Sequence, residues 1–68
     1  MTGLNTEPNL ADPDAVYAAL VKMGEGLDDR AAQVAMAKLV LLLANHIGDE
    51  AVLNEAMAIA RGAAQQAA

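Results

Sequence analysis

The chain has 68 residues with no cysteine, tryptophan or phenylalanine, a net charge of −5 at pH 7, and a hydrophobic content of 56%. These values exclude disulfides and thiolate metal sites, and they disfavour nucleic acid and anionic membranes, which both reward basic patches. A domain of this size buries barely enough apolar surface to offset the entropy of ordering its chain. We therefore expect a very regular helical core or a partner subunit.

Residues 1–11 are predicted to form an extended N-terminal arm. Gly3, Asn5 and Pro8 oppose regular structure, and the residue before a proline is pushed toward extended geometry. Two leucines, Leu4 and Leu10, are candidates to pin the arm against the rest of the domain. The alternative is a frayed terminus.

A first helix is predicted over residues 13–24. Asp12 suits the N-cap, and Pro13 suits the first helical position, where its missing N–H costs nothing. Gly24 and Gly26 are expected to end the helix. Its main apolar face is made by Val16, Leu20, Met23 and Leu27.

The second helix is predicted over residues 29–47. Asp28 or Asp29 caps its start, and Gly48 is placed to adopt the left-handed conformation after its end. On a helical wheel, the largest apolar arc is expected to face the other two helices. This predicted seam consists of Met36, Leu39, Val40, Leu43 and Ile47.

The third helix is predicted over residues 50–61, with Asp49 as its cap and Arg61 near its negative end. Gly62 is expected to stop the helix, so that residues 63–68 form a C-terminal tail; the alternative is that these residues continue the helix. One face of this helix is made by Val52, Ala56, Ile59 and Ala63. Together the segments predict an all-α protein, with a small three-helix domain over residues 12–62 that consists of a helical hairpin plus one helix.

Apolar residues of the second helix also lie outside its seam. Leu41 and Val34 fall about 140–160° from Met36 and Leu42 about 240°, while Ala37 and Ala44 beside Leu41 would allow close helix contact. Two short neighbouring helices are too small to cover so much apolar surface, so we predict an interface. Its predicted residues are Tyr17, Val34, Leu41, Leu42, Leu53 and Met57. The alternative is that the helices splay and engulf the second helix.

Residues that could carry chemistry are few. His46, Asp49 and Glu50 have metal-ligand character, but Gly48 separates the histidine from the carboxylates, and the set is short of a typical transition-metal site. His46 is instead expected to pack near a helix end. Serine and cysteine nucleophiles are absent from the sequence. We therefore predict no catalytic, cofactor-binding or metal-binding residue, and no enzyme activity.

Two stretches resemble a family of short bacterial proteins, domain-of-unknown-function family 2783. They are "LNTEPNLADPDAVYAAL" and "KLVLLLANHIGDEAVLNEAMAIAR", of which "LVLLLANHIGD" is the most specific part. The family has no established activity, so the resemblance implies no functional residue. Its genes neighbour those of flavin-dependent aromatic hydroxylases or related oxidoreductases, which implies at most an accessory chain in aromatic-compound oxidation.

The function expected from these observations is that of a non-catalytic helical interaction module. It would self-associate as a homo-oligomer or dock on a larger protein, for which the resemblance suggests a flavin-dependent oxidoreductase. The alternative is a small helical protein that binds a hydrophobic ligand between its helices. The start of the sequence lacks the pattern of a signal peptide, and its longest apolar run is far shorter than a membrane helix, so we expect a soluble cytoplasmic protein.

Overall fold

The computed structural model describes residues 3–67, which form three α-helices joined by short links. Helix α1 spans Pro13–Met23, α2 spans Asp29–Ile47, and α3 spans Glu50–Ala67. This confirms the predicted all-α fold with three helices. Residues 1 and 2 of the predicted arm and residue 68 of the predicted tail lie outside the described residues.

The helices begin where short acidic side chains can cap them. The Oδ1 atom of Asp12 accepts the N–H of Ala15 at 3.0 Å, and that of Asp28 accepts the N–H of Ala31 at 2.8 Å. These bonds satisfy N–H groups that have no partner within the helix. The sequence left open whether Asp28 or Asp29 caps α2. The structure shows that Asp28 is the cap and Asp29 is the first helical residue.

The corner between α2 and α3 contains two residues. Gly48 has a φ of +68°, and its N–H donates to the carbonyl oxygen of Ala44, so it ends α2 in the predicted left-handed conformation. Asp49 caps the next helix through the N–H of Val52 at 3.2 Å. The residue that ends α2 and the residue that caps α3 are therefore adjacent, and α3 begins directly after the end of α2.

Helix α3 continues through Gly62 to Ala67, so the prediction that Gly62 ends it is wrong. One glycine inside a helix costs about 1 kcal/mol relative to alanine. The residues after it are alanine and glutamine, which are strong helix formers and offset that cost. As a result, Arg61 lies inside the helix rather than in its last turn.

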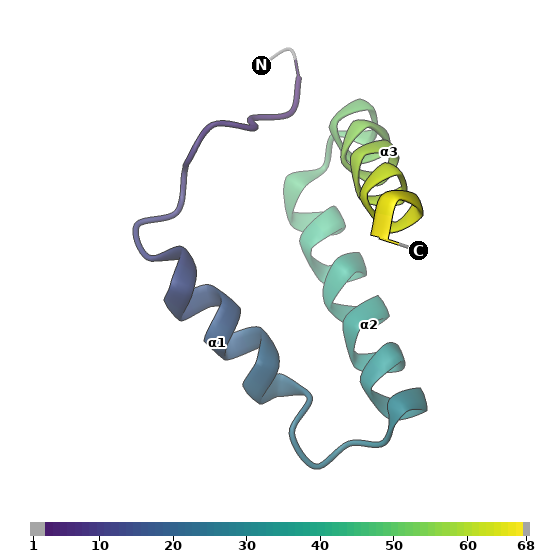
Figure 1. Ribbon diagram of the computed structural model, residues 1–68. Coiled ribbons are helices and arrows are strands. Elements are labelled where there is room, and N and C mark those ends of the chain that lie inside the picture. Colours follow the sequence, from purple (N-terminus) through teal and green to yellow (C-terminus); the bar gives the residue numbers. More distant parts are fainter. Residues whose placement is uncertain (1–2, 68) are drawn as a thin grey trace.

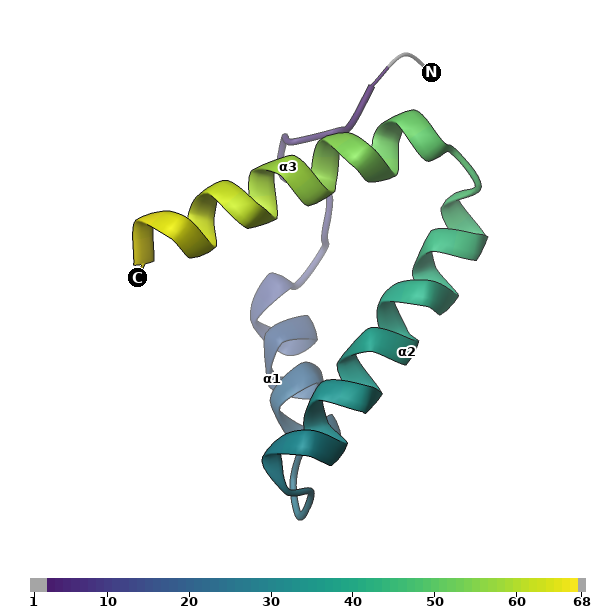
Figure 2. The ribbon, with the colours of Figure 1, turned by 90° about the vertical axis from the view of Figure 1, so that its right-hand side faces the viewer.

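The three helices form an open arrangement. In Figure 1, α1 and α2 diverge from their connecting turn, and Figure 2 shows α3 running sideways from the upper end of α2. The Cα radius of gyration is 13.5 Å, whereas a compact chain of this length has about 11 Å. The chain is therefore more extended than a closed three-helix bundle.

The described helices hardly pack against one another, and Val52 is the one buried apolar side chain, at 6% exposure. The predicted seam is therefore wrong as a contact within this chain. Four of its members, Met36, Val40, Leu43 and Ile47, are exposed, and Leu39 is half-buried. The alternative of an engulfed second helix is equally excluded. The reason is geometric, because α1 and α3 leave α2 at its two ends instead of running along it.

Replacing the α2 cap is expected to weaken the fold measurably. Asp28→Ala removes the acceptor of the Ala31 N–H and should lower the free energy of unfolding by about 1 kcal/mol. Urea denaturation followed by circular dichroism measures this change. Asp28→Asn keeps a side-chain acceptor and should restore most of the loss. Equal losses in the two variants would show that the charge, and not the hydrogen bond, stabilises the helix start.

Candidate interaction surface

The apolar residues of α2 are open to solvent on several sides. Leu41 is 65% exposed and Val34 is 62% exposed, and these are the highest values among the large apolar residues of this helix. Leu42, on another side of the helix, is also exposed. The structure thus places all three predicted interface residues of α2 at the surface.

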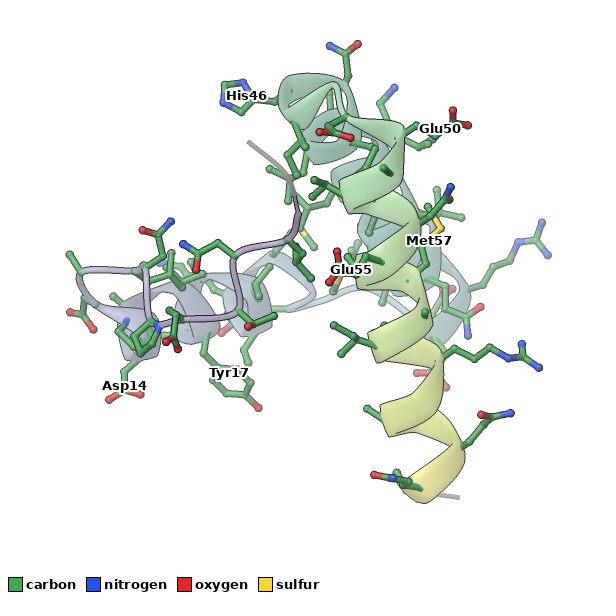
Figure 3. All side chains as sticks on the ribbon, turned by 90° about the horizontal axis from the view of Figure 1, so that it is seen from above. Asp14, Tyr17, His46, Glu50, Glu55 and Met57 are labelled. Atoms are coloured by element: carbon green, nitrogen blue, oxygen red, sulfur yellow. The ribbon has the colours of Figure 1, made fainter. Side chains whose placement is uncertain are left out.

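Helix α1 exposes every one of its residues, including its apolar ones. Tyr17 is 70% exposed and projects away from α2 and α3 (Figure 3). The main apolar face, which includes Val16 and Leu20, is also open to solvent. An isolated helix shorter than about 12–15 residues is only marginally stable in water. The 11 residues of α1 therefore lack the packing that normally stabilises a helix.

The two predicted interface residues of α3 differ in exposure. Met57 is exposed, whereas Leu53 is half-buried one turn further toward the start of the helix. Leu53 follows the buried Val52, so it lies at the corner where α3 meets the end of α2. The six predicted residues are spread over three helices that point in different directions, and the structure does not gather them into one continuous patch.

A contact that sequence reasoning missed connects the arm to α3. The backbone N–H of Leu4 donates to Oε1 of Glu55 at 3.1 Å, between residues 51 positions apart in the sequence. Figure 3 shows Glu55 on the side of α3 that faces the arm. Leu4 is half-buried, which agrees with its predicted role as a pin, whereas Leu10 is exposed. A lone glutamate on a helix gives no sequence signal for such a bond.

The bond between Leu4 and Glu55 is expected to hold the arm weakly. Glu55→Ala removes the acceptor, and an exposed hydrogen bond to a charged group is worth about 1 kcal/mol. Amide exchange at Leu4 should therefore speed up about fivefold. Glu50→Ala, on the same helix, is the matched control and should leave this amide unchanged. Unaltered exchange in Glu55→Ala would show that other contacts hold the arm.

A shallow hollow lies where the arm meets the corner of α2 and α3. It has a volume of about 490 Å³ and is lined by Leu4, Asn5, Asn9, Ile47, Asp49 and Val52. A second hollow, of about 440 Å³, lies within the bend of the arm itself. Tyr17, Leu41 and Leu42 line neither of them. The predicted interface residues are thus separate from both hollows, although Ile47 of α2 lines the first.

The residues with metal-ligand character do not come together. His46 is exposed and projects from the end of α2, and Glu50 lies on the outer side of α3 (Figure 3). Asp49 is engaged in its cap. Within residues 3–67, the structure contains no group of three or more histidine or carboxylate side chains placed to hold a metal ion.

Among the described residues, no helix combines the length and the apolar character needed to cross a membrane.

No curated protein and no solved structure matches the chain. A family model does match, "Protein of unknown function (DUF2783)", over residues 4–62. That range includes the arm from Leu4, all of α1 and α2, and most of α3. The chain therefore belongs to the DUF2783 family of proteins of unknown function.

Proposed function

We propose that this protein is a non-catalytic helical interaction module that assembles through the apolar surfaces of its helices. The observation that carries the proposal is the burial of a single apolar side chain, Val52, in the described part of a chain that is 56% hydrophobic. Within residues 3–67, sixteen large hydrophobic residues are exposed. Exposed apolar patches larger than those of a typical monomer mark interaction sites, and each helix contributes exposed apolar residues to this surface.

The total exposed area supports the same proposal. The chain exposes 5959 Å², whereas a compact monomer of 7.0 kDa exposes about 4,000 Å². The difference of about 2,000 Å² per chain exceeds the roughly 800 Å² that each partner buries in a standard stable interface. An assembly could therefore bury the excess surface of this chain.

The partner in this proposal is either another copy of the chain or a larger protein. A flavin-dependent oxidoreductase of aromatic-compound metabolism is a candidate through the resemblance of the family alone. In that case the chain would be a cytoplasmic accessory subunit. His46 and the acidic residues have no chemical role in this proposal.

Hydrogen exchange combined with native mass measurement tests the proposal on the purified protein. Because α1 buries no side chain within its own chain, its amides should be protected only in an assembled species and should exchange faster on dilution. The amides of α2 provide an internal comparison. A monomer whose α1 amides remain protected at every dilution would contradict the proposal, because the helices would then close on each other within one chain.

The alternative function, binding of a hydrophobic ligand between the helices, has one observation in its favour. The hollow beside Val52 has an apolar lining from Leu4, Ile47 and Val52 and amide groups from Asn5 and Asn9. A small apolar ligand with one polar group would suit such a lining. Its place beneath the arm differs from the predicted place between helices. Chemical-shift changes confined to these residues, on titration with a small aromatic compound, would favour the alternative.

A further inference from the structure

Four residues of α2 form a line along the helix, in which large and small side chains alternate. They are Val34, Ala37, Leu41 and Ala44, hereafter the α2 stripe. Their spacing of three and four residues keeps them within about 80° of one another on the helical wheel. Val34 and Leu41 are the most exposed large apolar residues of α2. The stripe is therefore a ridge with two small-residue gaps.

The two large residues of the α2 stripe, Val34 and Leu41, face away from the rest of their own chain. Of the five half-buried residues of α2, Ala31, Ala32, Ala35 and Leu39 lie on the other side of the helix, and Ala44 lies within the stripe. The middle of that side is about 150° from the middle of the stripe. Nothing in the described chain covers Val34 or Leu41, so the stripe is available to a second molecule.

We propose that the α2 stripe of one copy binds the α2 stripe of a second copy, with the two helices antiparallel. This inference rests on the proposed function and names its partner. In an antiparallel pair centred on position 39, Val34 lies opposite Ala44, and Leu41 lies opposite Ala37. Each large side chain thus meets a small one, and the same contacts repeat across the two-fold axis, as a self-complementary interface requires. Alanine at the contact lets the two backbones approach closely.

The charges along the stripe agree with the antiparallel direction. Arg30 lies on the line of the stripe near the start of α2, so in this register it faces Gly48 of the second copy. The second α2 ends there, and the last carbonyl groups of a helix are unpaired and attract a cation. A parallel pair would instead place the two arginines beside each other. Lys38 flanks the stripe, and its exposed, flexible side chain can extend into water.

The overlap in this register is almost complete. The centre at position 39 is one residue from the middle of α2, which spans Asp29–Ile47, so nearly the full length of both helices is paired. Residues 31–47 of each helix are paired, and at 1.5 Å per residue the paired length is about 25 Å. A second copy is also the one partner present wherever the chain is made, which suits a chain that packs so little against itself.

Disulfide trapping tests the register directly, because the natural chain has no cysteine. Chains carrying Ala37→Cys are mixed with an equal amount of chains carrying Leu41→Cys and oxidised mildly. The products are separated without reductant and identified by mass. The antiparallel register predicts that the mixed 37–41 product exceeds both self-linked products several-fold. His46→Cys, on another side of α2, replaces Ala37→Cys in the matched control and should give little mixed product.

Sedimentation of the natural chain is the second measurement of this test, because it gives the oligomeric state. Each combination of results supports or overturns the inference. A dimer with the mixed product in excess supports the inference. A dimer with self-linked products in excess, or with equal trapping through His46→Cys, overturns it. A monomer with rapidly exchanging α1 amides also overturns it, while an interaction with another protein remains. A monomer with protected α1 amides overturns both the inference and the proposed function.

A swap of side-chain sizes separates the contact from general destabilisation. Ala37→Leu places two leucines opposite each other, and Leu41→Ala leaves two alanines with a gap. Each single variant should raise the dimer Kd about tenfold. The double variant again places one leucine opposite one alanine, and its Kd should return to within about threefold of the natural value. A double variant weaker than both single variants would contradict the pairing.

Discussion

Leu41→Glu is expected to abolish self-association of the chain at micromolar concentration. Leu41 is the most exposed large apolar residue of α2, and the substitution would place a carboxylate against the apolar stripe of a second copy. An unpaired charge buried in an interface costs several kcal/mol. The dimer Kd should therefore rise by more than about a hundredfold, which equals about 2.7 kcal/mol. Sedimentation equilibrium measures this change.

The matched control is Leu42→Glu, one residue further along the same helix. Leu42 is similarly exposed but lies about 100° away from Leu41 around the helix, outside the α2 stripe. The inference predicts a clearly smaller change in Kd for this variant. If the two variants weaken association equally, the interface is wider than the stripe. If Leu41→Glu unfolds the chain without changing the mass of the assembly, Leu41 belongs to a core within one chain.

The melting temperature is expected to rise with protein concentration. When folding and dimerisation are coupled, dissociation accompanies unfolding, so mass action stabilises the folded form in concentrated solution. Two chains of 68 residues unfold with an enthalpy of about 95 kcal/mol at roughly 0.7 kcal/mol per residue. A hundredfold increase in concentration should then raise Tm by about 10 °C. Circular dichroism at 222 nm over a dilution series measures the shift.

The same dilution series has a built-in control in the Leu41→Glu variant. With its association removed, this variant should melt at a lower temperature, and its Tm should be independent of concentration. Helix content of the variant is expected to fall most in α1, because that helix buries no side chain in its own chain. A constant Tm in the natural chain would show that folding is complete within one molecule.

The starts of the three helices and the end of α2 could be predicted from the sequence because their signals are local. Asp12 with Pro13, and Gly48 with Asp49, act through contacts that span at most four residues, and the structure contains each of them. Helix α1 was predicted to end at Gly24 and ends one residue earlier, at Met23. The end of α3 could not be predicted from Gly62, because the outcome depends on the balance between one glycine and the helix formers that follow it.

The relative placement of the helices could not be predicted. The hydrophobic pattern of a helix does not indicate the direction in which the next helix leaves the connecting link. The seam around Met36 and Leu43 predicted a core shared by three helices, yet these residues remain exposed. Periodicity identifies apolar faces, but it does not say whether the same chain or another one covers them. For this reason the excess of apolar residues on α2 predicted exposure correctly, whereas the seam did not predict packing.

The two corners of the chain differ in length. Between α2 and α3 there are only a left-handed glycine and a capping aspartate, which allow little change in backbone angles. Between α1 and α2 there are five residues, including Gly24 and Gly26, and the second of these has a φ of +78°. Glycine accepts a wide range of backbone angles at low cost. We expect the orientation of α1 relative to α2 to change when a partner binds, while the angle between α2 and α3 stays constant.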